Sequence, residues 1–338
     1  MHRCLQLAEK GLGQVAPNPM VGCVVVYDDK IISEGYHEYY GGLHAEPNAI
    51  KKVDDELLKQ CTLYVTLEPC SHFGKTPPCA DLIISKKIKK VVVGNLDSNP
   101  LVAGKGIQKL RDAGIEVEHG ILDKECRNLN KRFFTFHEKK RPYIILKWAQ
   151  TGDGYISRFP LPDNKADNWI TGSESKALVH QWRAEEQAIL VGHNTALWDN
   201  PFLTTRLVTG KNPIRLLITK TLDLPNNLNL LNDEAQTIIF NSLEDGVKGH
   251  ITYVKINWDM VTKDILNYCY QNNISSIIVE GGTNTLSNFM KQNVWDEARV
   301  FVNPTIHFEN GILAPKINLE NNTPITIGND LLHVITNP

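Results

Sequence analysis

The stretches HAEPNA (residues 44–49) and TLEPCSHFGKTPPC (residues 66–79) decide the fold and the chemistry of the first part of this chain. His44, Cys70 and Cys79 offer one imidazole and two thiols. A catalytic zinc takes three such ligands and leaves its fourth position open for water. Glu46 lies two residues after His44, where a carboxylate can move a proton from the attacking water to a departing nitrogen. The pattern predicts a hydrolytic zinc site with Glu46 as its proton carrier.

Zinc deaminases that act on nucleobases share the signature H-x-E…P-C-x-x-C. The tripeptide HAE at 44–46 fits its first half and the dipeptide PC at 69–70 begins its second, but eight residues separate the two cysteines instead of two. The alternative is a closed structural zinc site, which needs a fourth ligand. His37 and His72 are the candidates, and neither has an established ligand spacing.

Composition is that of an ordinary globular protein, with 42% hydrophobic and 22% charged residues. The length of 338 residues favours two domains, and the net charge of −2 gives no general attraction to nucleic acid. The apolar run VGCVVVY has only the length of a strand, so no membrane span is expected. Seven cysteines without an apolar leader favour a reducing compartment, and we expect a cytoplasmic protein.

The first region alternates strands and helices in the order of a three-layer α/β sheet. We expect helices over 2–11, from about 44, over 79–86 and over 106–113, a hairpin of 21–27 with 30–35, and strands over 62–67, 91–94 and 115–118. His44 and Cys79 then stand at helix starts, where the helix dipole favours a thiolate.

The segment HEKKRP (137–142) is the expected boundary, which gives domains over 1–140 and 141–338. The second region is again α/β with mostly parallel crossovers. We expect strands over 143–147, 187–192, 214–219, 237–240, 275–280 and 299–302, and helices over 173–183, 259–271 and 283–292. Ser173 is the expected N-cap of the first of these helices. The turn EGGT (280–283) can face a phosphate with backbone N–H groups or can be a simple tight turn, and the GxGxxG fingerprint is absent.

The two regions resemble, in order, the two halves of the bifunctional riboflavin-biosynthesis deaminase/reductase family. The motifs that carry the deaminase resemblance are PNPMVG (17–22), HAE, PCSH, TPPC (76–79) and DSNPLVAGKG (97–106). Those of the reductase resemblance are LKWAQTGDG (146–154), NWITG (168–172), WRAEEQAILVGHNTALWDNPFLTTR (182–206) and VEGGTNTLSNFM (279–290). The long insert between the two cysteines is characteristic of this family.

The resemblance implies a cytidine-deaminase-like three-layer α/β/α domain followed by a dihydrofolate-reductase-like α/β domain. It also implies Zn²⁺ and NADPH as cofactors. The reactions would be hydrolytic deamination of 2,5-diamino-6-(5-phosphoribosylamino)pyrimidin-4-one and then reduction of its ribosyl group to the ribitylamino product. Phosphorylated pyrimidines would be the binding partners, with no nucleic acid and no membrane, and the chain would form a homo-oligomer, a dimer or a tetramer.

Site residues follow from the same resemblance, position by position. Those that align with nicotinamide-nucleotide contacts are Ala149, Trp169, Thr195, Asp199, Gly282, Thr283, Asn284 and Thr285. Those that align with contacts to the reductase substrate are Asp167, Arg183, Leu203, Arg206 and Glu280. Those that align with contacts to the deaminase substrate are Asn18, His37, Lys75, Asp97 and Asn99.

The chain departs from the family pattern at Gln187 and Thr219, where acidic residues are common, and at Thr151-Gly152, which replaces Ser-Leu. Three other readings stay open at this point. One is a monofunctional zinc deaminase with a non-catalytic C-terminal domain, and another is a nucleic-acid base editor, which the near-neutral charge disfavours. The third is a non-catalytic zinc-binding module, in which Glu46 would be dispensable.

Overall fold

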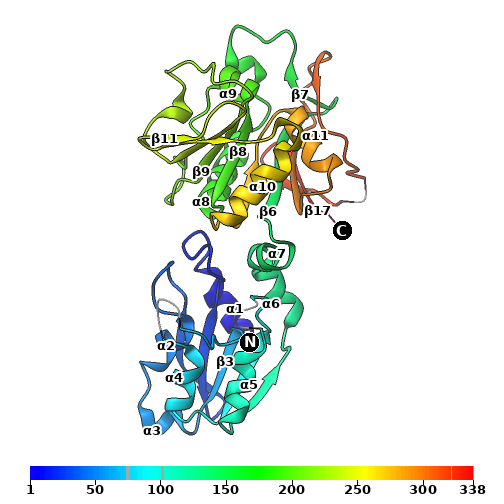
Figure 1. Ribbon diagram of the computed structural model, residues 1–338. Coiled ribbons are helices and arrows are strands. Elements are labelled where there is room, and N and C mark those ends of the chain that lie inside the picture. Colours follow the sequence, from blue (N-terminus) through cyan, green and yellow to red (C-terminus); the bar gives the residue numbers. More distant parts are fainter. Residues whose placement is uncertain (74–76, 100–102, 321, 338) are drawn as a thin grey trace. The chain divides into compact units, whose positions relative to one another are not determined.

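The computed structural model describes residues 1–73, 77–99, 103–320 and 322–337. It divides into two compact units, Met1–Arg141 and Pro142–Pro338 (Figure 1). Within the described ranges, no helix is long and apolar enough to cross a membrane.

The N-terminal unit is built on a five-stranded sheet of order β2-β1-β3-β4-β5. Its strands are β1 (Gly22–Tyr27), β2 (Lys30–Tyr36), β3 (Thr62–Leu67), β4 (Lys90–Asn95) and β5 (Glu116–His119). Its helices are α1 (His2–Glu9), α2 (Ala45–Ile50), α3 (Asp55–Leu58), α4 (Cys79–Ser85), α5 (Lys105–Asp112), α6 (Asp123–Leu129) and α7 (Lys131–Lys139). The expected hairpin is confirmed, and Asp28 and Asp29 both take positive φ, as a tight two-residue turn requires.

Alternation along the strands produces the three layers of this unit. On β1, Cys23 and Val25 face a core that helices α2, α4 and α5 cover, whereas Val24 packs with α1 on the opposite face. Successive side chains of a strand point to opposite faces, so a strand buried on both faces must be apolar throughout. The pattern GCVVVY meets that requirement, and the predicted three-layer sheet is confirmed.

The C-terminal unit is built on a ten-stranded sheet of order β11-β12-β10-β9-β8-β13-β6-β14-β17-β16, which is parallel from β12 to β14. Its strands are β6 (Tyr143–Thr151), β8 (Ala188–Gly192), β9 (Ile214–Ile218), β10 (Thr237–Asn241), β11 (Gly246–Lys248), β12 (Ile251–Lys255), β13 (Ser276–Val279), β14 (Glu297–Asn303), β16 (Ile325–Ile327) and β17 (Asp330–Thr336). A separate pair consists of β7 (Tyr155–Arg158) and β15 (Gly311–Leu313). The helices are η1 (Lys165–Asn168), α8 (Ser173–Glu185), α9 (His193–Asp199), η2 (Asn229–Leu231), η3 (Trp258–Met260), α10 (Val261–Gln271) and α11 (Thr283–Lys291).

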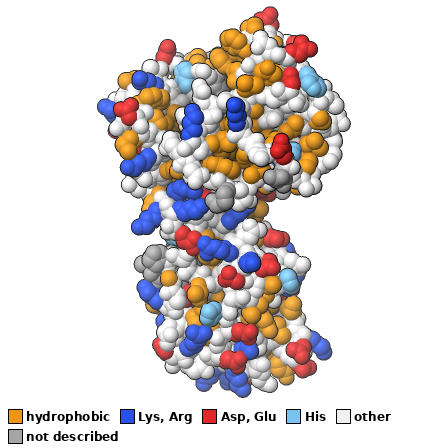
Figure 2. Space-filling model, turned by 90° about the vertical axis from the view of Figure 1, so that its right-hand side faces the viewer, with side chains coloured by type: hydrophobic (Ala, Val, Ile, Leu, Met, Phe, Trp, Pro, Cys, Tyr) orange, Lys and Arg blue, Asp and Glu red, His pale blue; other side chains and the backbone are white. Residues whose placement is uncertain are grey.

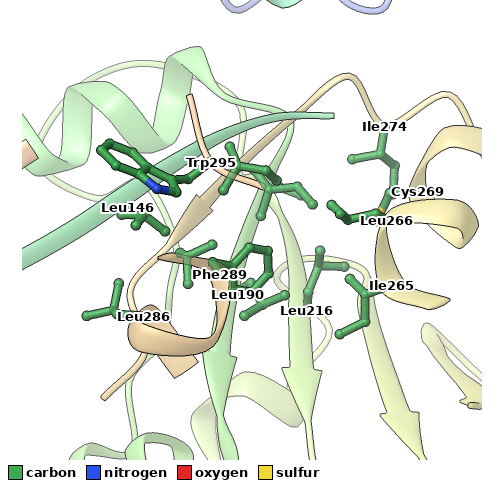
Figure 3. Close-up of a cluster of buried hydrophobic side chains, with 14 of the residues drawn as sticks. Leu146, Leu190, Leu216, Ile265, Leu266, Cys269, Ile274, Leu286, Phe289 and Trp295 are labelled. Atoms are coloured by element: carbon green, nitrogen blue, oxygen red, sulfur yellow. The ribbon is translucent and has the colours of Figure 1, made fainter. Parts of the chain in front are cut away.

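The core of this unit lies on both faces of its sheet. Figure 3 shows Leu146 of β6, Leu190 of β8 and Leu216 of β9 packed against side chains of α10 and α11, among them Ile265 and Phe289. The intervening residues of the same strands face the other way, where α8 and α9 cover them. The unit is therefore a second three-layer α/β/α structure, and the predicted α/β class with mostly parallel crossovers is confirmed.

The predicted Ser173 cap of α8 is wrong. The N-cap residue is Gly172, and the Ser173 hydroxyl donates to Glu174 instead. The start of the helix is held by the fully buried Asp330, whose Oδ2 accepts from the Gly172 N–H at 2.8 Å and from the Ser175 hydroxyl at 2.6 Å. A carboxylate at a helix N-terminus stabilises the helix wherever it comes from in the chain.

Figure 2 shows the side chains on one face of the molecule. Acidic and basic side chains are mixed over the N-terminal unit, and hydrophobic side chains are more prominent over the C-terminal unit. This mixture of signs fits the net charge of −2.

Candidate active sites

The three predicted zinc ligands meet at one end of the N-terminal sheet. His44 is the N-cap residue of α2, Cys70 follows the end of β3, and Cys79 is the first residue of α4. In parallel α/β sheets, ligands bind at the carboxyl ends of the strands. Strands β3 and β4 run parallel, so the cluster lies where such a site is expected.

The geometry of the cluster fits a tetrahedral zinc ion. The Nδ1 atom of His44 lies 3.4 Å from the Sγ atom of Cys79 and 3.6 Å from that of Cys70, and all three ligand atoms lie within 4.8 Å of one another. Zinc bonds of ~2.3 Å to sulfur and ~2.0 Å to nitrogen at tetrahedral angles separate the ligand atoms by about 3.6 Å. One imidazole and two thiolates are also the donor types that zinc prefers.

Local electrostatics favour a thiolate at Cys70. The hydrogen bond from the Cys79 thiol, together with His44, lowers the pKa of Cys70 to about 4 despite its burial. The backbone N–H of Cys79, at the start of α4, also donates to the Cys70 sulfur at 3.3 Å. The same hydrogen bond raises the pKa of Cys79, because Cys79 is the donor of the pair.

Glu46 lies beside this cluster in the first turn of α2, and its side chain is only 3% exposed. Burial, reinforced by the charge of Cys70, raises the pKa of Glu46 to about 7. A general base that must later act as an acid works best with a pKa near the operating pH. Glu46 is therefore suited to take up a proton and return it at neutral pH.

Asn18 and His37 form a hydrogen-bonded pair next to the ligand His44. The His37 ring lies 5.4 Å from the His44 ring, and its pKa is lowered by burial. Its Nδ1 atom lies 2.9 Å from the Leu43 carbonyl oxygen and its Nε2 atom 3.1 Å from the Asn18 Nδ2 atom. Since a carbonyl can only accept, Nδ1 carries the proton and Nε2 accepts from Asn18.

Two of the remaining predicted deaminase contacts, Asp97 and Asn99, lie on the segment after β4. Asp97 is 9% exposed, and burial, together with the charges of Glu68 and Cys70, raises its pKa to about 7. Its Oδ1 atom accepts from the backbone N–H of Asn99 at 2.7 Å. Lys75, the predicted phosphate contact, lies outside the described residues.

In the C-terminal unit, an ion cluster lies beyond the end of β13. Arg183 of α8 donates from Nη2 to Oε2 of Glu280 at 2.8 Å, and Nζ of Lys147 on β6 lies 3.9 Å from the same oxygen. Burial alone would raise the pKa of Glu280, but Arg183 and Lys147 outweigh it and hold that pKa at about 2. The sequence predicted Arg183 and Glu280 as site residues but not Lys147, because a single lysine after the apolar run of residues 143–146 carries no signal of a site.

Two other predicted substrate residues, Leu203 and Arg206, follow α9, and the charge of Arg183 of the cluster acts on Arg206. The backbone N–H of Arg206 donates to Nδ1 of His180 at 3.0 Å, and the guanidinium donates to Thr204 Oγ1 at 2.9 Å. Leu203 is 2% exposed, has φ of +55°, and packs in a hydrophobic cluster. Because its side chain is enclosed, a contact of Leu203 with a ligand would come from its backbone.

The turn EGGT brings together several of the predicted cofactor residues. Gly282 is the N-cap of α11, and intrahelical bonding begins with the Leu286 N–H, which leaves the amides of residues 283–285 at the helix start. A Cβ atom on Gly282 would meet only Thr195 Oγ1, at 3.7 Å. That free space and the helix start are suited to a dinucleotide phosphate.

The two glycines of this turn differ in what requires them. Gly282 has φ of −65°, which any residue can adopt. A Cβ on Gly281 would approach Thr285 Cβ to 2.6 Å, so close packing against α11 is what requires that glycine.

The other predicted cofactor and substrate positions are more exposed. Ala149 lies on β6, paired with Phe301 of β14. Asp167 and the 56% exposed Trp169 lie at and just after the short helix η1. Asp199 ends α9, and its carbonyl accepts from Lys165 of η1 at 3.4 Å.

Two family models match the chain, one in each unit. A family model for the cytidine and deoxycytidylate deaminase zinc-binding region matches residues 1–95, and one for the RibD C-terminal domain matches residues 142–311. Fold and site thus define an enzyme that joins a zinc-binding deaminase domain to a dihydrofolate-reductase-like reductase domain.

Relatives of known name match over most of the chain. Riboflavin biosynthesis protein RibD of Aquifex aeolicus is 45% identical over 312 residues, 90% of this chain and 86% of that protein. RibD of Escherichia coli strain K12 is 33% identical over 333 residues, 90% and 87% of the two chains. The chain belongs to the RibD family of bifunctional riboflavin biosynthesis proteins.

A solved structure agrees over the whole length. The crystal structure of the deaminase/reductase from Thermotoga maritima matches with a TM-score of 0.87 and 38% identity, covering 99% of this chain and 97% of that one. These full-length matches disfavour the monofunctional alternative.

Proposed function

We propose that the N-terminal unit, residues 1–140, deaminates 2,5-diamino-6-(5-phosphoribosylamino)pyrimidin-4-one and that residues 141–338 then reduce the ribosyl group of the product with NADPH. The observation that carries the proposal is the convergence of His44, Cys70 and Cys79 beside the buried Glu46. The Arg183–Glu280 pair and the free helix start at Gly282 support the reductase half.

In the deaminase site, His44, Cys70 and Cys79 would hold zinc, which supplies an activated water at neutral pH. Glu46 takes a proton from the attacking water and passes it to the departing amino nitrogen, so that ammonia leaves. Its pKa of about 7 lets it do both. Asn18 and Asp97 would hold the pyrimidine in position, and the hydrogen bond with His37 would fix the Asn18 amide.

In the reductase site, the backbone of Gly282 and the start of α11 would hold the phosphates of NADPH, and Ala149, Trp169, Thr195 and Asp199 would contact the rest of the cofactor. When bound, the cofactor would supply the hydride for the ribosyl carbon. Arg183 and Arg206 offer planar forks to the substrate, and Glu280 and Leu203 fix its position. Orientation of the two reactants can account for much of the rate. The homo-oligomeric state and the cytoplasmic location stay predictions.

A coupled assay tests both halves. Purified protein receives the deaminase substrate and NADPH, and ammonia and NADPH are followed separately. Glu46→Gln is expected to keep zinc and to lose ammonia release by about 10²–10⁴-fold, while NADPH oxidation with already deaminated substrate continues. Near-normal ammonia release by this variant would contradict the role of Glu46, and the absence of NADPH oxidation in the wild type would contradict the reductase proposal.

A further inference from the structure

Glu68 is a buried carboxylate beside the deaminase site that the proposed mechanism does not use. It follows β3 directly, stands two residues before the ligand Cys70, and is 3% exposed. Its backbone N–H donates to the Asn95 carbonyl at 2.9 Å, which ties it to the end of β4. A buried carboxylate is costly unless hydrogen bonds satisfy it, so its partners indicate its role.

Among the described residues, Glu68 accepts hydrogen bonds from the backbone N–H groups of Asp97, Gly104, Gly106 and Ile107. Its Oε2 atom accepts from Asp97 at 3.1 Å and from Gly104 at 2.9 Å, and its Oε1 atom accepts from Gly106 at 2.8 Å and from Ile107 at 3.2 Å. Each oxygen thus accepts two bonds. A carboxylate can do this with both oxygens, whereas an amide can do so with only one.

These hydrogen bonds hold two parts of the chain, Asp97 after β4 and the first turn of α5. Asp97 is held through its own N–H, and its side chain in turn accepts from the Asn99 N–H. At the other end, Gly106 and Ile107 lie in the first turn of α5, where Gly104, the N-cap, has no side chain to offer. Glu68 supplies the missing negative charge at that helix start.

The first turn of α5 also lies very close to the backbone next to Cys70. A Cβ atom on Gly106 would lie 2.0 Å from the Pro69 carbonyl oxygen and 3.1 Å from Glu68 Oε1. Only glycine permits this approach. The metal-ligand loop and the substrate segment are therefore joined through one side chain and one glycine.

We propose that Glu68 is a positioning residue that holds Asp97 and Asn99 at the deaminase site and thereby sets the affinity for the pyrimidine substrate. The inference rests on the proposed deaminase function, because it takes Asp97 and Asn99 as substrate contacts. A purely structural role would affect folding or zinc binding, whereas a positioning role affects substrate affinity in a folded, zinc-loaded protein.

Glu68→Gln is the direct test. The amide keeps the size of the side chain but turns an NH₂ group toward two of the four N–H donors. Substrate binding is measured by calorimetric titration with the authentic pyrimidine in a Glu46→Gln background, where turnover is stopped. Because one or more substrate contacts are misplaced, the Kd of the substrate is expected to rise by about tenfold or more. In a wild-type background, KM rises more than kcat falls, and zinc content and NADPH oxidation with deaminated substrate are unchanged.

Glu116→Gln is the matched control. It makes the same chemical change in the same unit, at a carboxylate that is 68% exposed and pairs with Lys90. In the same Glu46→Gln background, the Kd of the substrate for this control is expected to equal the Kd for the Glu46→Gln single variant. An unchanged Kd in the Glu68 variant would overturn the proposal, as would a fall in kcat without a change in KM.

Gly106→Ala is a second route to the same displacement, and it leaves the carboxylate in place. The added methyl group must push the segment away from Pro69. The same loss of affinity with full zinc supports the proposal, whereas loss of zinc in both variants would overturn it in favour of a structural role. If the wild type releases no ammonia from the substrate, the proposed deaminase function fails and this inference fails with it.

Discussion

The ion cluster of the reductase unit predicts a pH-dependent stability. Glu280 has a side chain that is 11% exposed, and its carboxylate meets Arg183 at 2.8 Å and Lys147 at 3.9 Å. These cations hold its pKa at about 2, against a usual value of 4.5. Glu280→Gln removes this titration and leaves both cations without their buried partner.

The magnitude follows from the pKa difference. A shift from 4.5 to about 2, at about 1.4 kcal/mol per pKa unit, corresponds to about 3 kcal/mol of unfolding free energy. Because the pKa is lower in the folded state, the contribution is complete above about pH 5. It declines as the pH falls below the unfolded value, and it is lost near pH 2.

Tryptophan fluorescence isolates the relevant unit, because all six tryptophans lie after residue 147. Denaturant titrations from pH 7 to pH 3 are compared for the wild type, Glu280→Gln and the control Glu244→Gln, which alters an exposed pair with Lys248. The wild type and the control are expected to lose about 2 kcal/mol more stability over this range than Glu280→Gln does, because the rest of the contribution is lost only below pH 3. Parallel pH curves for all three proteins would refute the reasoning.

Three further predictions concern the zinc site, the cofactor turn and the cap of α8. The purified protein is expected to hold about one zinc per chain and to lose it in Cys70→Ser and Cys79→Ser, and full zinc in both variants by metal analysis would rule out these ligands. Gly282→Val is expected to fold and to deaminate normally but to bind NADPH more weakly in a calorimetric titration, because its side chain enters the open space near Thr195. An unchanged affinity for NADPH in the folded variant would show that this turn does not contact the cofactor. Asp330→Ala is expected to destabilise the C-terminal unit by roughly 1–3 kcal/mol, since it strips a buried cap, and a fluorescence-monitored unfolding midpoint equal to that of the wild type would contradict this.

The sequence predicts the fold best where a single pattern identifies an element. The largely continuous apolar runs of β1, β3 and β4 indicate strands buried on both faces, and the predicted bounds agree with the structure to within a residue or two. The zinc ligands could be predicted because their residue types are restricted and their neighbours are distinctive. They can be recognised although they are spread from His44 to Cys79 in the sequence.

Interactions that depend on tertiary approach could not be predicted. Glu68 reads in sequence as one more acidic residue, and only the folded chain shows that its partners lie 29 to 39 residues downstream. The positive φ of Leu203 and the close approach at Gly281 have no local signal either. Short elements such as α9 and β16 were missed because seven and three residues carry too little periodicity.

The Asp330 cap bears on how the chain is made. The residue that completes the start of α8 is added 155 residues after Ser175, the helix residue whose hydroxyl it accepts. At about 5–20 residues per second, a ribosome takes about ten to thirty seconds to cover that distance. During this interval the nascent helix lacks its cap, while Met1–Arg141 has already been translated in full. The C-terminal unit is therefore the last part of the newly made protein that can complete its fold, and a transcript broken before codon 330 would yield a chain with a complete N-terminal unit and an uncapped α8.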